Sequence, residues 1–209
     1  ALPGAARTGE LLVADIGLDA TLLAGVRTTV ATAEAVHALL PARPADAHKG
    51  TFGKALVVAG SSNYVGAASL AASGAYRVGA GLVTLAIAER IQPIVAAQLS
   101  EATYLLLPND LGAITDGALQ VLEDKIGSFD ALLVGPGLGR EQATAAFVRQ
   151  LVGADRSPSR RSVGFVAKGE PSGAATLAGL PALALDADAL NLLAGRSEWW
   201  QHLPVETVI

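Results

Sequence analysis

The chain has 209 residues, of which 51% are hydrophobic and 4% aromatic, and its formal net charge is -4. This length accommodates one ordinary domain, or one domain and a fragment. The acidic balance disfavours nucleic acid as a partner, no run reaches the roughly 18 apolar residues of a membrane span, and the lack of Cys excludes disulfides and thiolate chemistry. The lack of Cys fits a cytoplasmic protein, and three His residues well apart in the sequence disfavour a His-rich metal site.

The first part of the chain does not follow the pattern of the rest. Residues 10–16, ELLVADI, predict a short buried strand. Thr32 predicts the N-cap of a helix that stops at Pro41, and the proline-rich segment PARPADAHKG then predicts a linker. We therefore expect residues 1–30 to be the tail of an upstream domain, followed by a capping helix and linker at residues 31–47.

From Lys54 onward, strand and helix patterns alternate with short turns between them. Continuous apolar runs, typical of strands buried on both faces of a parallel sheet, occur at residues 55–59, 81–87 and 103–107 and at the starts of 130–140 and 182–194. Helical patterns occur at residues 66–79, 91–99, 115–126 and 140–152 and at the end of 182–194. Repeated βα units predict an α/β fold with a mostly parallel sheet and helices on both faces. The stretch 153–180 breaks the pattern, and we assign it no βαβ unit.

Both ends of the chain are unusual. The sequence contains no Met and begins ALPGAAR. It stops at LPVETVI, an apolar run with β-branched residues that predicts a strand entering a sheet. We therefore expect a piece of a longer protein, cut at both ends.

Three corners where a strand ends and a helix begins are candidate ligand sites, because open α/β sheets bind ligands there. The first corner, GSSNYVG, fits neither the Walker P-loop nor GxGxxG. It is either a turn whose glycines serve the backbone shape or a ligand loop in which a small residue lets a bulky ligand rest on the helix start. Its candidate residues are Gly60, Asn63, Gly66 and Ala67.

The second corner, GPGLG, directly follows an apolar strand. Three closely spaced glycines predict a backbone that must approach something closely, either a ligand or the neighbouring helix. Its candidate residues are Gly135 and Gly137.

The third corner, DADALN, places two carboxylates at the end of a strand and the start of a helix. One Asp at such a place is an ordinary N-cap. A second carboxylate is more than a cap needs, and two of them can orient a hydroxyl or attract Mg²⁺. Both interpretations stay open, and the candidate residues are Asp186 and Asn191.

The ordered set of these segments resembles one family. HKGTFGKALVVAGS, GAA, RVGAGLVTLA, LLVGPGLG and LDADALNLLA, in this order, resemble the NAD(P)H-hydrate dehydratase family, which has the ribokinase-like fold. GELLVADIGL is similar to the end of the NAD(P)H-hydrate epimerase domain that precedes the dehydratase in bifunctional bacterial proteins. The resemblance implies a ribokinase-like three-layer sandwich, incomplete here. Residues 48–209 would be the N-terminal part of the dehydratase domain, and residues 1–30 the epimerase-like tail.

The resemblance implies a metabolite-repair enzyme, a carbon-oxygen lyase that restores NAD(P)H from its hydrate. Hydroxide is a poor leaving group, so the ring hydroxyl is phosphorylated by ADP, or by ATP, with Mg²⁺, and phosphate is then eliminated. The family's hydrate-binding positions fall on Ala67 and Gly137. Its catalytic residues are expected beyond Ile209, so we expect this chain alone to be inactive. A homo-oligomer, with a tetramer as the expected form, is also implied.

Two alternatives stay open. One is another ribokinase-like small-molecule kinase, acting on a vitamin precursor. The other is a non-catalytic dinucleotide-binding module.

Overall fold

The computed structural model describes residues 7–10, 12, 14–28, 30–154, 180–204 and 206–209. The irregular stretch 153–180 therefore lies almost wholly outside the described residues. The chain divides into two units, Ala1–Ala45 and Asp46–Ile209. The origin of residues 1–30 in an upstream domain stays a prediction.

The first unit contains a 3₁₀ helix, η1 (Ala20–Leu23), and a short helix, α2 (Ala33–Leu39). The predicted N-cap is confirmed, because Thr32 Oγ1 accepts a hydrogen bond from Ala35 N at 3.2 Å. The buried strand predicted at residues 10–16 is wrong: its described residues form no strand and are exposed. A strand needs a neighbour to pair its backbone groups, and the described residues of this unit contain no strand to pair with.

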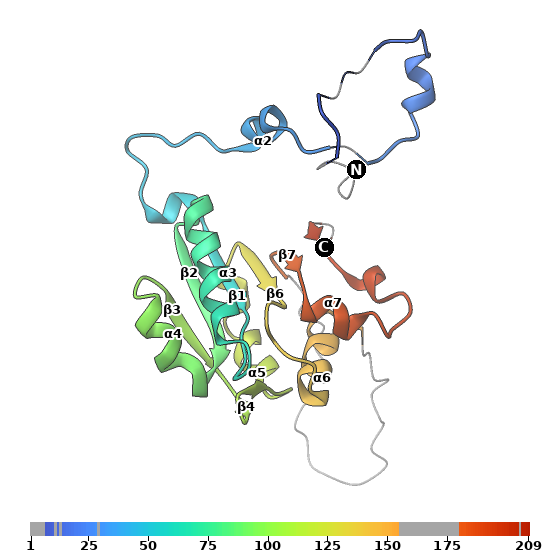
Figure 1. The fold of residues 1–209 in the computed structure, drawn as a ribbon. Helices are drawn as coiled ribbons and strands as arrows, with labels where there is room; N and C mark the ends of the chain where they lie inside the picture. Colours follow the sequence, from blue (N-terminus) through green and yellow to red (C-terminus); the bar gives the residue numbers. More distant parts are fainter. Residues whose placement is uncertain (1–6, 11, 13, 29, 155–179, 205) are drawn as a thin grey trace, which may run out of the picture. The chain divides into compact units, whose positions relative to one another are not determined.

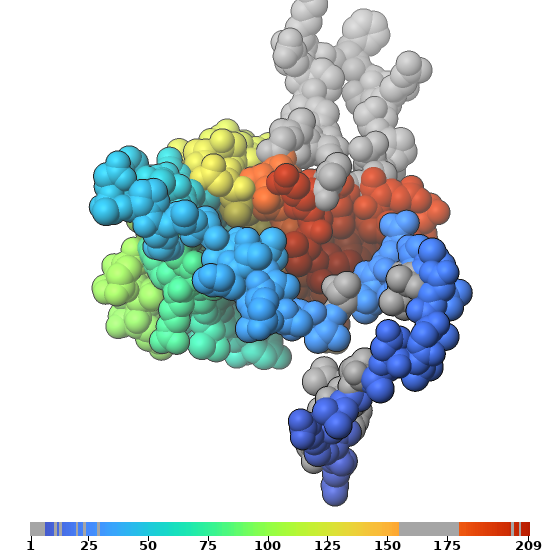
Figure 2. Space-filling view, turned by 90° about the horizontal axis from the view of Figure 1, so that it is seen from above, coloured from blue at the N-terminus to red at the C-terminus, as the bar shows by residue number. Residues whose placement is uncertain are grey.

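The second unit is built on a parallel sheet with the strand order β3-β2-β1-β6-β7-β8 (Figure 1). The strands are β1 (Lys54–Val58), β2 (Leu82–Ala88), β3 (Thr103–Leu107), β6 (Ala131–Val134), β7 (Ala182–Leu185) and β8 (Thr207–Val208). All pairings in this sheet are parallel. The predicted strands are confirmed, and the apolar end of the chain does enter the sheet, as β8 beside β7. In the space-filling view, the residues around 130–150 (yellow to orange) lie directly against residues 180–209 (red), although far from them in sequence (Figure 2).

Helices cover both faces of this sheet, which confirms the α/β architecture. The α-helices are α3 (Val65–Val78), α4 (Gln92–Gln98), α5 (Ala118–Glu123), α6 (Gln142–Leu151) and α7 (Asp188–Leu193). The 3₁₀ helices are η2 (Lys49–Phe52), η3 (Glu89–Ile91), η4 (Ile126–Ser128) and η5 (Trp199–His202). α3 contacts β1, β2 and α4, whereas α6 contacts α5 and α7. The β1-to-β2 and β6-to-β7 crossovers run in opposite directions along the sheet, so right-handed crossovers place their helices on opposite faces.

Small side chains let α3 lie close to the sheet. Ala68 and Ala72 of this helix are fully buried, and α3 packs against β1 and β2. Interiors pack at crystal-like density, so residues larger than alanine at these helix positions would push α3 away from the strands. Ala68 and Ala72 are thus part of the core.

Two local features differ from the sequence prediction. The helix predicted over residues 115–126 is shorter, because α5 ends at Glu123 and η4 follows. A hairpin that the sequence analysis missed follows β3, formed by the antiparallel strands β4 (Asn109–Asp110) and β5 (Ala113–Ile114). Strands of two residues are too short to show a periodic pattern.

An apolar groove of about 380 Å³ lies on the α3 face of the sheet, lined by residues of β1, β6, β7 and β8 and by Ala75 of α3. It runs along the strands and not at their carboxyl ends, where ligands of such sheets bind. Among the described residues, no helix has the length and apolar character needed to cross a membrane.

Candidate functional site

The sheet reverses its strand order next to β1. From β1 the chain first adds β2 and β3 on one side, and it then crosses to the other side to add β6, β7 and β8. Open α/β sheets bind ligands outside the carboxyl ends of their strands at such a switch point. The segments that leave β1 and β6 there are residues 60–66 and 135–139, the first two corners predicted from the sequence.

The two loops contact each other through their backbones. Gly60 N donates a hydrogen bond to Pro136 O at 2.8 Å, and Gly135 N donates to Val58 O at 3.1 Å. Gly137 has a φ of +64°, and a Cβ there would lie 2.5 Å from Ala67 Cβ and 2.7 Å from Tyr64 Cβ. The close approach predicted for this glycine is therefore to the start of α3. Packing alone requires glycine at this position.

The third corner adjoins the second. A Cβ on Gly135 would collide with Asp186 O and lie 3.0 Å from Ala189 Cβ. Asp186 N donates a hydrogen bond to Val134 O at 3.1 Å, which ties the end of β7 to the end of β6. The structure thus brings all three predicted corners to one edge of the sheet.

The start of α3 supplies two free backbone donors among the described residues: Val65 N and Gly66 N have no acceptor, whereas Ala67 N donates a hydrogen bond to Tyr64 O at 3.1 Å. Its N-cap is Tyr64, whose side chain makes no capping hydrogen bond. The first N–H groups of a helix have no partner within the helix and attract anions. Ala67 is half-buried in this first turn, whereas Asn63 and Gly66 are exposed. This corner therefore presents amide groups and small side chains to a ligand.

The missed hairpin borders the first corner. Ser62 Oγ donates a hydrogen bond to Leu111 O at 2.8 Å, and Ser62 N donates to Gly112 O at 3.3 Å. Next to it, Ser61 is 3% exposed, and among the described residues its Oγ has no hydrogen-bond partner. The sequence signal that marks this hairpin is the turn Asn109-Asp-Leu-Gly112, in which Gly112 N donates to Asn109 Oδ1 at 3.1 Å.

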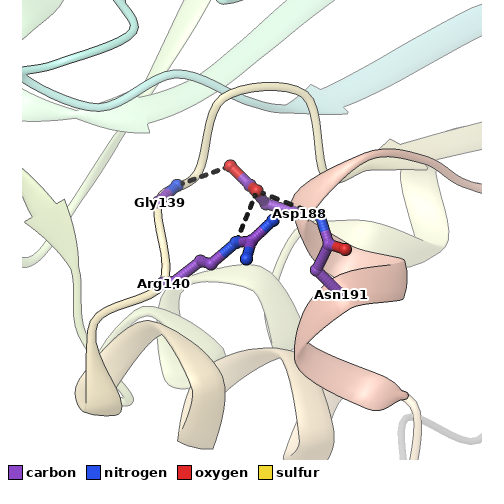
Figure 3. Close-up of polar contacts among 4 residues, drawn as sticks. All are labelled: Gly139, Arg140, Asp188 and Asn191. Carbon is purple, nitrogen blue, oxygen red and sulfur yellow. Dashed lines mark hydrogen bonds and ion pairs between the residues drawn. The ribbon is translucent and has the colours of Figure 1, made fainter.

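The N-cap interpretation of the acidic corner is wrong. The N-cap of α7 is Ala187, at a φ of 48°, and no side chain caps this helix. The Asp188 carboxylate instead accepts hydrogen bonds from Gly139 N at 3.0 Å and from Asn191 Nδ2 at 3.4 Å (Figure 3). It also forms an ion pair with Arg140 Nε at 3.6 Å. Asp188 therefore joins the second corner to α7, while the Asp186 side chain is exposed.

The described carboxylates do not gather into a metal site. Mg²⁺ is held by several oxygen ligands, chiefly carboxylates. No group of three or more His, Cys, Asp or Glu in the described parts of the chain is placed to hold a metal ion, and Asp188 is engaged by three neighbours. We therefore assign none of the described residues to Mg²⁺.

The fold is that of a ribokinase-like α/β protein. A ribokinase-like superfamily protein from Enterococcus faecalis superposes with a TM-score of 0.53 at 20% identity, over 75% of this chain and 44% of that chain. The ADP/ATP-dependent NAD(P)H-hydrate dehydratase from Bacillus subtilis, co-crystallized with ATP/Mg²⁺, superposes with a TM-score of 0.51 at 30% identity, over 76% of this chain and 46% of that chain. A sequence model described as NAD(P)H-hydrate dehydratase matches residues 55–163. The chain belongs to the NAD(P)H-hydrate dehydratase family.

Curated relatives agree with this family. The bifunctional NAD(P)H-hydrate repair enzyme Nnr of Moorella thermoacetica is 40% identical over 153 residues, and that of Salinibacter ruber is 39% identical over 201 residues. These matches cover 72% and 92% of this chain but 29% and 32% of the relatives. The ADP-dependent (S)-NAD(P)H-hydrate dehydratase of Bacillus subtilis is 36% identical over 125 residues, covering 59% of this chain and 42% of the relative. The chain thus spans about a third of the length of the bifunctional relatives and less than half of the single-function one.

Proposed function

We propose that this chain is part of an enzyme that dehydrates NAD(P)H hydrate back to NAD(P)H, a carbon-oxygen lyase reaction that depends on ADP or ATP. Support comes from the family match over residues 55–163 and from the names of the relatives. The observation that carries the proposal is the contact between Ala67 and Gly137 at the switch point of the sheet. Both residues lie inside the segment that the family model matches.

We propose that this corner seats the hydrate. Ala67 and Gly137 present a methyl group and bare backbone at the carboxyl ends of β1 and β6, next to Tyr64, and the amides of Val65 and Gly66 belong to the same turn of α3. Such amides suit the phosphate groups of a dinucleotide. A surface of small residues and backbone lets a flat ring approach closely.

The other predicted residues would border this seat. Asn63, Gly66 and Asp186 are exposed and open to a ligand. Gly60 and Gly135 shape the two loops through their backbone contacts, and the amide group of Asn191 is directed to Asp188. Their direct contact with a ligand stays a prediction.

The nucleotide would supply, when bound, the phosphoryl group that makes the ring hydroxyl a leaving group. We assign no residue of this chain to the nucleotide. The part that this chain contributes is binding and orientation of the hydrate, which in phosphoryl transfer is a large share of catalysis.

We further propose that residues 1–30 are the end of an epimerase domain. The match to the bifunctional enzyme of Salinibacter ruber covers 92% of this chain, so it extends into the unit Ala1–Ala45. We also propose a cytoplasmic location, because reduced nicotinamide coenzymes serve intracellular metabolism. The expected homo-oligomer is tested by light scattering of the purified full-length gene product.

The test is an assay of the full-length gene product with NADH hydrate, ADP and Mg²⁺, followed by the near-ultraviolet absorbance of the restored dihydropyridine. Recovery that requires ADP or ATP supports the proposal. Phosphorylation of a thiazole or pyridine alcohol without recovery would identify a vitamin-precursor kinase instead. Hydrate binding without turnover would identify a dinucleotide-binding module.

A matched pair of variants assigns the activity to this corner. Ala67→Val adds bulk where the hydrate would rest, and it should raise KM for the hydrate about tenfold or more, equal to a loss of about 1.4 kcal/mol of binding. Ala97→Val makes the same change at an exposed position of α4 and should leave KM unchanged. Equal KM values for the two variants would show that Ala67 does not contact the hydrate.

A further inference from the structure

We propose that Asp188 is a positioning residue for the hydrate site. Its carboxylate holds the far end of the loop 135–139 and thereby fixes where Gly137 faces Ala67. This inference rests on the proposed function of that loop.

The carboxylate has a donor on each of its oxygens. Gly139 N donates to Oδ2 at 3.0 Å, while Asn191 Nδ2 lies 3.4 Å and Arg140 Nε 3.6 Å from Oδ1. Figure 3 shows the carboxylate of α7 directed between the loop and Asn191. The Asp188 side chain is 17% exposed, whereas that of Arg140 is 69% exposed.

These contacts differ in strength. A hydrogen bond from a backbone N–H to an ionised carboxylate is stronger than one between neutral groups. An ion pair with an exposed arginine contributes little, because water screens it. The bond from Gly139 N, between residues 49 positions apart, is therefore the contact that holds the loop.

The loop is then fixed on both sides of Gly137. Before it, Gly60 N donates to Pro136 O, and Gly135 packs against the backbone of Asp186. After it, Gly139 is bound to Asp188. Gly137 fits against Ala67 with no room for a methyl group, so a shift of the loop end changes the shape of the proposed seat. Displacements on the scale of 1 Å are enough to lower catalytic efficiency strongly.

Asp188→Asn in the full-length gene product tests this role. The amide keeps the size of the side chain but has one acceptor oxygen where the carboxylate has two. Arg140→Ala is the matched control, because it removes a partner of the same carboxylate and leaves the Gly139 bond in place. Asp188→Glu restores the charge and should recover part of the effect.

Two measurements are made on each variant. Hydrogen exchange at the Gly139 amide reports whether the loop is held, and it requires no ligand. The KM values for NADH hydrate and for ADP report whether the hydrate is positioned. For Asp188→Asn we expect faster exchange and a rise in hydrate KM of about tenfold, with the ADP KM within about twofold, and for Arg140→Ala no change in either.

Each contrary result overturns a stated step. Unchanged exchange at Gly139 in Asp188→Asn would show that the carboxylate does not hold the loop. Faster exchange with an unchanged hydrate KM, or an equal rise in both KM values, would show a structural role without positioning. A parent protein that does not process the hydrate would overturn the proposed function and the positioning role together, while the exchange at Gly139 still reports on the loop, so the two failures are distinguished.

Discussion

Replacing Gly137 with alanine is the most direct structural perturbation of the candidate site. Gly137 has a φ of +64°, and a Cβ there would lie 2.5 Å from Ala67 Cβ and 2.7 Å from Tyr64 Cβ. Carbon atoms in contact normally rest about 3.5–4.0 Å apart. The added methyl group would therefore be about 1 Å too close to both neighbours.

The expected destabilisation has two parts. A residue with a side chain in the left-handed region costs about 1–2 kcal/mol. Inserting a methyl group into a packed contact costs about 1–3 kcal/mol. Together they lower the free energy of unfolding by about 2–5 kcal/mol, unless the loop moves away from α3, in which case hydrate binding is lost instead.

The assay is urea unfolding of the parent and of Gly137→Ala, together with hydrate binding. The matched control is Gly74→Ala, since Gly74 lies within α3 and a Cβ there would meet nothing within 4 Å. This control should raise the free energy of unfolding by about 0.5–1 kcal/mol, because glycine weakens a helix interior. If the free energy of unfolding of Gly137→Ala lies within about 0.5 kcal/mol of the parent value and the variant binds the hydrate normally, Gly137 does not pack against Ala67 as described.

Three further changes test the surroundings of the site by urea unfolding. Leu111 is 77% exposed at a φ of 49°, so Leu111→Asn should stabilise the protein by about 1 kcal/mol, and a loss of stability would refute the turn geometry. Thr144 is fully buried and its Oγ1 donates to Ile114 O at 2.9 Å. Thr144→Val should therefore lower the free energy of unfolding by about 1–3 kcal/mol, and Thr144→Ser by less. Equal losses in the two variants would show that this hydrogen bond does not stabilise the fold. Tyr76 OH donates to Glu101 O at 2.7 Å, so Tyr76→Phe should cost about 1 kcal/mol, and no change would mean that water replaces the bond.

Much of the fold could be predicted because its signals are local. Buried parallel strands are continuous apolar runs, and the runs ALVVA and TYLLL predict β1 and β3 to within one residue. Turn positions with a positive φ favour glycine, and Gly60, Gly135 and Gly137 have such values, so glycine spacing marks the corners after β1 and β6. A strand also needs a second strand to pair with, and the local sequence does not show whether one is present. Residues 10–16 have the composition of a strand, but the described part of their unit contains no strand that could pair with them.

The details of the site depend on contacts between distant segments. The glycines of GPGLG predict close contact with either a ligand or a helix. The packing of Gly137 on Ala67 shows the contact with the helix, and the contact with a ligand stays a prediction. Asp188 was weighed as a helix cap, but its partner Gly139 lies 49 residues away. Gly139 and Asp188 meet because β6 and β7 are neighbours in the sheet. That pairing depends on the assembly of the whole sheet and not on the local sequence.

The central claim is that the corner formed by Ala67 and Gly137 seats the hydrated nicotinamide dinucleotide. The most direct measurement is a crystal structure of the full-length gene product with NAD(P)H hydrate. We expect the dinucleotide at the carboxyl ends of β1 and β6, in van der Waals contact with both residues. A dinucleotide bound elsewhere, for example in the groove along β6, β7 and β8, would contradict it.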